Sequence, residues 1–198
     1  MNILMKVCLI SLVAIGINGK QVKVQVYYES LSSNSMSFIV NQLYPAFATI
    51  GSEKIDLELV PWGLATETIV DETKTVVCQH GSEECYANKV HACAIDAFDV
   101  IASTGFISCA ESAVFPANDA DLKECATKVG ISWCEIEECV KTGRGDELQS
   151  ANQEKTALLN LSYVPTIIID GSYSDENQNA AERDFEGFIC GLLGDYDA

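Results

Sequence analysis

The chain has 198 residues, of which 48% are hydrophobic, and 12 basic residues face 29 acidic ones for a formal net charge of −17 at pH 7. This size and composition predict one compact domain and exclude fibrous and disordered classes. Such an acidic chain repels phosphate backbones and anionic lipid surfaces, so we expect no nucleic-acid binding.

Residues 1–19 have the composition of a secretory signal peptide. They contain Lys6, no acidic residue and an apolar run from Val7 to Ile17. Cleavage is expected after Gly19, with Gly16 as the alternative. Because a membrane span needs roughly 20 apolar residues and no later stretch approaches that length, we predict a secreted, extracellular protein with no membrane span.

The first elements of the mature chain, residues 20–198, predict a strand, a helix and a second strand. Residues 22–28 alternate apolar and polar positions, as a strand with one buried face does. Ser33 or Asn34 can cap a helix that ends before Pro45. Residues 55–60 alternate again, and the length of the crossover predicts that the two strands are parallel.

A helical insertion is predicted from about residue 81 to 145. Ser82 precedes an acidic first turn, Asn118 or Asp119 opens a short helix that ends at Gly130, and Ser132 begins another that ends at Gly143.

The last part of the chain predicts a return to mixed structure. Asp146 is expected to cap a helix to about Leu161, followed by a β-branched strand at residues 166–170. Gly171 and Ser172 allow a tight hairpin into Tyr173. A final helix is expected over residues 180–193.

The resulting order of elements predicts an α/β, thioredoxin-like fold with helices inserted between its two halves. We expect a single domain from residue 20 to 198. That fold carries a cis proline before its third core strand, and Pro165 occupies this position.

Eight cysteines remain after residues 1–19 are removed, and we predict that all eight form a disulfide framework. On one helix, Cys85 and Cys93 would lie about 12 Å apart, beyond disulfide reach, and the same argument separates Cys134 from Cys139. The connectivity stays open. The predicted framework comprises Cys78, Cys85, Cys93, Cys109, Cys125, Cys134, Cys139 and Cys190.

The cysteine block contains an ordered set of residue types at fixed spacing. It reads Cys78-Gln79-His80-Gly81, then Glu84-Cys85, Asn88 and Cys93. This run resembles the signature of the gamma-interferon-inducible lysosomal thiol reductase (GILT) family. Residues 27–31 and 163–165 also look like family segments. The sequence is similar to the insect branch, with a mosquito salivary member as the narrower expectation, and the resemblance makes a lysosomal location the alternative to secretion.

The resemblance implies a Cys-x-x-Cys pair at the start of the first helix, where a helix N-terminus favours the thiolate. The matching positions here are Ser32 and Ser35. A hydroxyl forms no stable disulfide and is not appreciably ionised by a helix dipole, so the dithiol cycle cannot run through these residues. We therefore expect no catalytic residues, and a pseudoenzyme in place of an enzyme.

Two other chemistries are weighed and set aside. A metal site formed by Cys78, His80, Cys85 and Cys93 lacks the short cysteine knuckle of zinc sites, so we expect no metal and no cofactor. A serine hydrolase needs an oriented base, and the only histidines, His80 and His91, lie in the cysteine block.

Two short motifs bear on integrin binding and on glycosylation. Arg144-Gly145-Asp146 is an integrin-type tripeptide in a predicted loop between helices, but turn formation and capping account for it, so we expect no integrin binding. Asn160 begins the acceptor pattern for N-linked glycan in the mature chain, which predicts a glycoprotein.

The function predicted from the sequence is binding of another protein, such as a surface protein of a host or a microbe. The predicted surface is the face around Ser32, Ser35 and Pro165, or the helical insertion. The alternative is a residual thiol-disulfide oxidoreductase that uses a labile disulfide involving Cys78 or Cys85.

Overall fold

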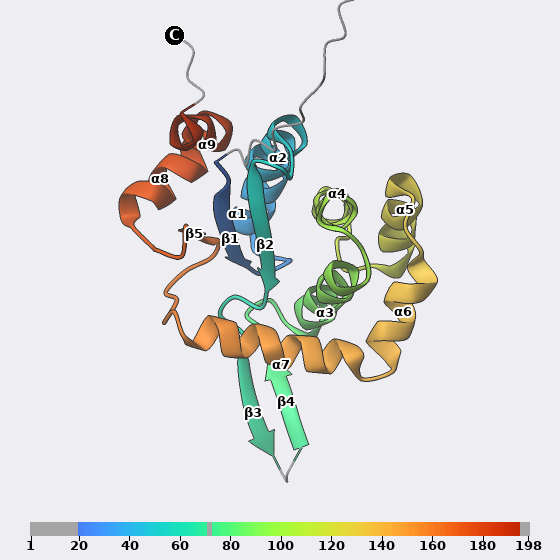
Figure 1. Cartoon of the computed structure of the whole chain (residues 1–198). Helices are drawn as coiled ribbons and strands as arrows, with labels where there is room; N and C mark the ends of the chain where they lie inside the picture. Colours follow the sequence, from blue (N-terminus) through green and yellow to red (C-terminus); the bar gives the residue numbers. More distant parts are fainter. Residues whose placement is uncertain (1–19, 71–72, 195–198) are drawn as a thin grey trace, which may run out of the picture.

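A three-stranded sheet lies at the centre of the protein, in a computed structural model that describes residues 20–70 and 73–194 (Figure 1). Strand β1 (Val22–Tyr28) lies between β2 (Ile55–Pro61), to which it is parallel, and β5 (Thr166–Ile169), to which it is antiparallel. The predicted parallel pair is confirmed. The predicted signal peptide and its cleavage site lie outside the described residues.

The central strand β1 is buried along its length. Val22, Val24 and Val26 face the main core and are fully inaccessible to solvent, and the last residues of the strand are buried on both faces. Burial of these side chains stabilises the fold by roughly 1.5–3 kcal/mol each, before the cost of ordering the chain. The turn that follows β1 therefore starts from a rigid strand end.

The helix after β1 differs from the prediction at both ends. Helix α1 (Ser33–Phe38) is capped by Ser32, one residue before the predicted caps. A π-helical segment (Ile39–Leu43) then leads into α2 (Tyr44–Ile50), so the helical path does not end before Pro45. Pro45 lies in the first turn of α2, where a missing N–H breaks no regular helical hydrogen bond.

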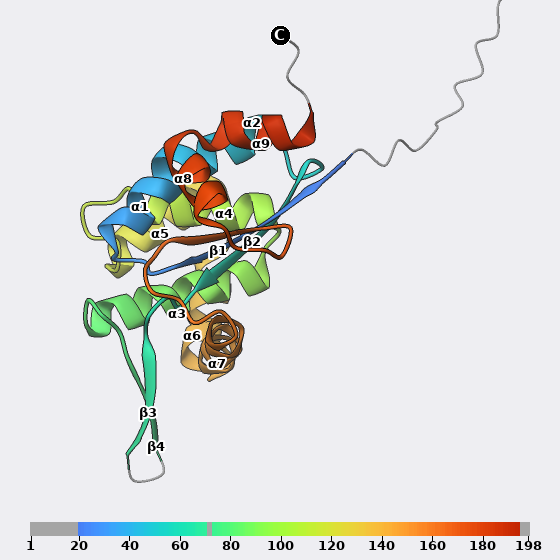
Figure 2. The ribbon, with the colours of Figure 1, turned by 90° about the vertical axis from the view of Figure 1, so that its left-hand side faces the viewer.

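A separate hairpin, formed by β3 (Thr66–Val70) and β4 (Thr73–Val77), was not predicted from the sequence. It projects from the body of the molecule beyond the end of β2 (Figure 2). Ile69 and Val77 are exposed, and none of the hairpin side chains that the structure describes is buried, so no alternation of buried and exposed positions could have indicated the hairpin.

Five helices follow the hairpin; the first four lie beyond β2 in Figure 1, and the fifth runs across below the strands. The predicted starts near Ser82, Asn118 and Ser132 are confirmed: Asn118 and Ser132 cap their helices through side-chain oxygens. The helices are α3 (Ser82–Ala97), α4 (Val100–Glu111), α5 (Asp119–Val129), α6 (Trp133–Lys141) and α7 (Arg144–Ala157).

Helix α7 corresponds to the helix predicted from Asp146 to about Leu161, and both of its ends differ from the prediction. It begins directly after Gly143, which takes a left-handed conformation, so Asp146 lies inside the first turn and is not the cap. The helix ends at Ala157, short of Leu161, and unbroken helical structure thus continues beyond residue 145. A carboxylate in the first turn still interacts favourably with the helix dipole.

The C-terminal part contains two helices where one was predicted. Helices α8 (Asp175–Arg183) and α9 (Phe185–Leu193) are separated by Asp184, whose carboxylate accepts the Gly187 N–H and caps α9. The predicted hairpin into Tyr173 is reduced to one bridge between Ile169 and Ser172.

Six cysteines form three disulfides, which are Cys78–Cys85, Cys93–Cys139 and Cys109–Cys125. The argument from helical spacing is confirmed, because neither Cys85 with Cys93 nor Cys134 with Cys139 forms a pair. The prediction that all eight are bridged is wrong for Cys134 and Cys190, which are free. These two lie on α6 and α9, on opposite sides of the molecule, and cannot reach each other (Figure 1).

Alkylation without reduction, followed by peptide mapping, tests this connectivity. We expect the three bridged peptide pairs and two labelled cysteines, with Cys134 labelled first because it is exposed and Cys190 is only partly so. A bridged Cys134, or an unbridged Cys93, would contradict the framework.

Candidate functional site

The candidate site lies at the carboxyl end of β1, where residues 29–32 turn into α1. The Ser32 main-chain N–H donates to the Glu29 carbonyl at 3.2 Å, and the Ser32 hydroxyl accepts the Ser35 N–H at 3.4 Å. Both serines are buried, and the Ser35 hydroxyl has no hydrogen-bond partner among the described residues. The serines therefore shape the start of the helix.

The Val164–Pro165 peptide bond is cis, as expected from the sequence. Thr166 pairs with Tyr27 near the end of β1, which places Pro165 at the same end of the sheet as the turn. Gln178 of α8 fixes this segment, because its side-chain amide donates to the Pro165 carbonyl at 2.9 Å and accepts the Ile167 N–H at 2.8 Å.

Residues of the cysteine signature on α3 form hydrogen bonds to the turn. The Asn88 side-chain oxygen accepts the Ser30 N–H at 2.9 Å, and the Ser30 hydroxyl donates to the Glu84 carbonyl at 3.3 Å. Ser30, Glu84 and Asn88 are all buried. Because a buried N–H without a partner costs about 1–3 kcal/mol, Asn88 is a main determinant of where the turn lies.

The signature cysteines fix α3 in place. Cys78–Cys85 closes the short loop that contains His80 and Gly81 and ties the end of the hairpin to the first turns of α3, while Cys93 joins α3 to α6 through Cys139. The disulfides thus stabilise the helix that positions Ser30. The sequence analysis identified these cysteines but not this role.

Glu29 lies in the turn with its carboxylate fully buried. One oxygen, Oε1, accepts the Leu64 N–H at 2.7 Å, and Gly63 next to it has φ of +58° and no side chain, since a Cβ there would lie 2.4 Å from Glu29 Cγ. Burial raises the pKa of Glu29 to about 7, with nearby Glu84 adding to the rise; the Leu64 N–H and His80 oppose it.

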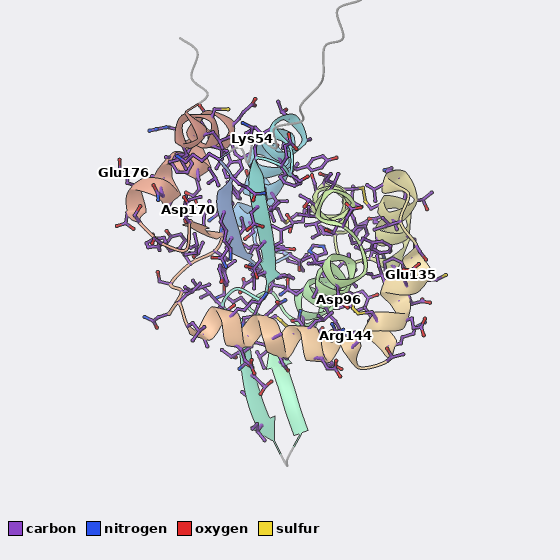
Figure 3. The ribbon with its side chains drawn as sticks, in the orientation of Figure 1. Lys54, Asp96, Glu135, Arg144, Asp170 and Glu176 are labelled. Atoms are coloured by element: carbon purple, nitrogen blue, oxygen red, sulfur yellow. A yellow bond between two sulfur atoms is a disulfide. The ribbon has the colours of Figure 1, made fainter. Side chains whose placement is uncertain are left out.

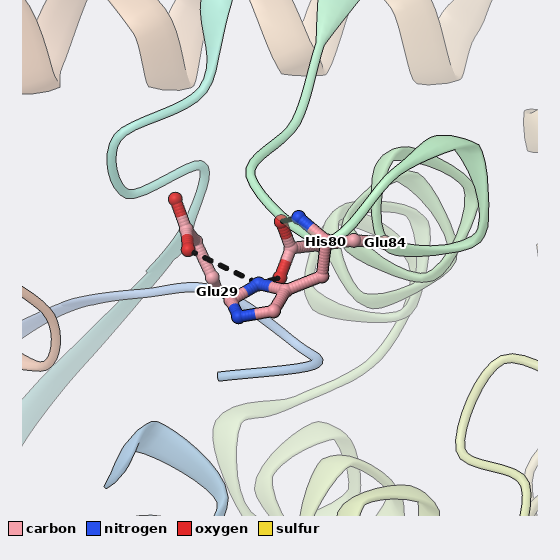
Figure 4. A group of neighbouring side chains, drawn as sticks. All are labelled: Glu29, His80 and Glu84. Carbon is pink, nitrogen blue, oxygen red and sulfur yellow. Dashed lines mark hydrogen bonds and ion pairs between the residues drawn. The ribbon is translucent and has the colours of Figure 1, made fainter. Parts of the chain in front are cut away.

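Glu29, His80 and Glu84 converge beside the turn (Figure 4). His80 Nδ1 lies 2.5 Å from Glu84 Oε2 and 3.7 Å from Glu29 Oε2, and the His80 main-chain N–H donates to Glu84 Oε1 at 3.0 Å. Sequence reasoning named His80 but missed this group, because Glu29 is distant in sequence from the other two.

The structure gives no support to serine hydrolase chemistry. Burial lowers the pKa of His91 to about 3, and its Nδ1 is hydrogen-bonded to the Tyr28 hydroxyl at 3.1 Å. His80 is bonded to Glu84. Among the hydrogen bonds of the described residues, none joins Ser32 or Ser35 to a histidine.

The integrin-type tripeptide lies in the first turn of α7, not in the predicted loop. Arg144 forms a two-pronged ion pair with Asp96 and a contact at 3.1 Å to Glu147, and Asp146 pairs with Lys89. Gly145 packs closely on α3, where a Cβ would lie 2.7 Å from Lys89 Cγ. These contacts give the tripeptide a structural role.

Asn160, the predicted glycosylation site, is exposed just beyond α7. Its φ of +50° is in the left-handed region, which asparagine tolerates better than most residues. The attachment of a glycan stays a prediction.

A groove next to the turn exposes apolar side chains. Leu31 lines it together with the loop between α4 and α5, in which Val114 is 83% exposed and Phe115 is 64% exposed. Isolated exposed apolar residues are ordinary, but two beside the turn form a candidate contact surface. The sequence analysis did not single out either residue.

No helix in the described ranges is both long and apolar enough to cross a membrane.

The free thiol of Cys134 is exposed on α6, which packs against α3, α5 and α7. This thiol and the turn at residues 29–32 are therefore on different elements of the fold.

Residues 23–129 match the family model for "Gamma interferon inducible lysosomal thiol reductase (GILT)". The chain is 32% identical to GILT-like protein 1 of Drosophila melanogaster, over 93% of this chain and 80% of that one. It is 34% identical to the gamma-interferon-inducible lysosomal thiol reductase of Carassius auratus, over 88% and 70%. A GILT-like protein of Anopheles gambiae is 32% identical, over 92% and 81%.

The similar solved structures confirm the thioredoxin-like fold. A thiol-disulfide oxidoreductase of Actinomyces oris, MdbA, matches with a TM-score of 0.62 over 90% of this chain and 82% of that one, at 14% identity. DsbA of Mycobacterium tuberculosis matches with a TM-score of 0.56 over 89% and 84%, at 16% identity. At these identities the likeness is one of fold.

Replacing Asn88 with Ala tests whether its hydrogen bond to Ser30 positions the turn. We expect the Asn88→Ala variant to lose about 1–3 kcal/mol of unfolding free energy, because the buried Ser30 N–H loses its acceptor. Urea denaturation measures the loss. Asn41→Ala is the matched control, since Asn41 is exposed and its side-chain amide donates to the Ser37 hydroxyl at 3.4 Å, and its effect should lie within about 0.5 kcal/mol. Equal effects of the two would contradict the assigned role.

Proposed function

The chain belongs to the GILT family, and we propose that it is a secreted member without dithiol reductase activity that acts by binding another protein. The observation that carries the proposal is the pair Ser32 and Ser35 at the start of α1, at the end of the sheet where Pro165 is cis. On this proposal, the family fold carries serines at the two positions where the resemblance implies the Cys-x-x-Cys pair of a reductase.

The chemistry of the dithiol cycle supports the proposal. A thiolate attacks a substrate disulfide, a mixed disulfide forms, and a second thiolate releases it. Ser32 and Ser35 supply hydroxyls, which do not form stable bonds of this kind. Ser32 instead accepts the Ser35 N–H and caps the helix, a role that serine performs well.

The alternative is a residual thiol-disulfide oxidoreductase, and one observation favours it. Cys134 is a free, exposed thiol, and Cys85 of the Cys78–Cys85 bridge is only partly buried. Both sulfur sites lie outside the turn at residues 29–32. Blocking of thiols therefore separates the two functions, because only the alternative requires one.

The groove beside Leu31 supports the binding role. Leu31 lies in the turn at residues 29–32, and the exposed side chains of Val114 and Phe115 line the same groove. Exposed apolar side chains that gather in a groove often mark a contact site for another protein. We place the contact surface for the partner protein on this groove and the adjoining turn.

Restoring the two cysteines tests the assignment of Ser32 and Ser35. The double variant Ser32→Cys/Ser35→Cys should reduce a protein disulfide in the presence of a thiol donor at least tenfold faster than the unchanged protein. The physical reason is that residue 32 begins α1 and Pro165 is cis at the same end of the sheet, where a helix N-terminus would favour a thiolate. The assay measures the rate of insulin reduction by turbidity.

The control is Ser33→Cys/Ser37→Cys, which adds two exposed thiols to the same helix outside the two critical positions. It should show only the donor rate. Equal gain in both double variants would contradict the positional argument.

Replacing Phe115 tests the contact surface. Immobilised wild-type protein and the Phe115→Ser variant are exposed to secretions of the source tissue, and captured protein is quantified by mass spectrometry. We expect at least a fivefold loss of the captured partner with Phe115→Ser. Ile101→Ser is the matched control, since Ile101 is 61% exposed on α4 and lies outside the groove. Unchanged capture by Phe115→Ser would exclude the groove as the interface.

A further inference from the structure

The group formed by Glu29, His80 and Glu84 presents three ligand atoms to one point. The atoms all lie within 4.8 Å of one another, and they come from the turn after β1, from the loop closed by Cys78–Cys85 and from the first turn of α3. Both carboxylates are fully buried, whereas the His80 side chain is 44% exposed and leaves a path from solvent.

Each carboxylate is oriented by a main-chain N–H. Leu64 donates to Glu29 Oε1 at 2.7 Å, and His80 donates to Glu84 Oε1 at 3.0 Å. The second oxygen of each, Oε2, is directed at His80 Nδ1 (Figure 4). Outer hydrogen bonds of this kind hold metal ligands in position in known sites.

The buried Oε2 of Glu29 is a second, independent observation. It has no hydrogen-bond partner within the described part of the chain. A simple contact between His80 and Glu84 would account for those two side chains but would leave this oxygen unsatisfied. A polar atom buried without a partner is costly, and a cation in the group would satisfy it.

We propose that Glu29, His80 and Glu84 bind one divalent transition-metal ion of the zinc class, through His80 Nδ1 and one oxygen of each carboxylate. An imidazole nitrogen among the ligands favours such an ion over calcium or magnesium, which prefer oxygen alone. Water occupies the remaining coordination position on the exposed side of His80, as in open zinc sites.

The distances fit this assignment with a small movement. Ligand atoms around a tetrahedral zinc ion, with bonds of about 2.0–2.1 Å, lie about 3.3 Å apart. His80 Nδ1 is 2.5 Å from one carboxylate oxygen and 3.7 Å from the other, so the imidazole shifts by under about 1 Å away from Glu84 and toward Glu29.

This site differs from the cysteine-based one that the sequence analysis set aside. In that set, Cys78, Cys85 and Cys93 are all consumed by disulfides, so they offer no thiolate. The proposed ion instead connects the turn after β1 to the start of α3. It does not depend on the absence of a dithiol, so its test is independent of the proposed function.

Isothermal titration of zinc ions into the secreted, disulfide-intact protein tests the site. Free thiols are first alkylated, so that Cys134 does not bind zinc. We expect one ion per chain for the unchanged protein and at least a tenfold weaker Kd for His80→Ala. Glu83→Gln is the matched control, since Glu83 is an exposed neighbour on α3, and its Kd should match the unchanged protein.

A thermal melt with and without zinc provides a second readout. Zinc that binds only the folded protein should raise the Tm of the unchanged protein and of Glu83→Gln, but not that of His80→Ala. His80→Ala removes a half-exposed side chain and leaves both buried carboxylates in place, so it is suited to the comparison. No binding by the unchanged protein, or equal binding by His80→Ala, would overturn the proposal.

Discussion

The hydrogen bond from the Ser30 main-chain N–H to the Asn88 side chain fixes the position of the turn between β1 and α1, and the geometry of the candidate site depends on that turn. Asn88 can make this bond because α3 is held by the Cys78–Cys85 and Cys93–Cys139 bridges. The Ser30 N–H is buried and cannot bond to water if Asn88 is lost, so losing this bond costs more unfolding free energy than losing an exposed one. The cysteine-rich block and the turn therefore form one structural unit.

Because of this arrangement, the fold around the turn does not require thiols at residues 32 and 35. Asn88 and the disulfides that hold α3 position the turn through the Ser30 main chain, which needs no thiol at residue 32 or 35. Serine at position 32 still caps α1, and serine at position 35 fits in the buried space. Serine at these two positions is thus compatible with the fold, and a hydroxyl forms no stable bond of the kind that disulfide exchange needs.

The sequence was sufficient to predict the parts of the fold with strong periodicity or a fixed motif, such as the β1–β2 pair and the cysteine signature. It missed the β3–β4 hairpin, in which none of the side chains that the structure describes is buried. The helix across Pro45 was not predicted because a π-helical segment carries the chain past it. The group around Glu29 depends on contacts between distant segments, and local sequence patterns contain no information on those.

Turnover of the unchanged protein shows whether this member of a reductase family lacks the reductase reaction, as proposed. Reduction of a protein disulfide is measured with a thiol donor between pH 4.5 and 7, before and after alkylation of Cys134 and Cys190. We expect the donor-only rate in both cases. Turnover above that rate that disappears on alkylation would show that the protein is a reductase.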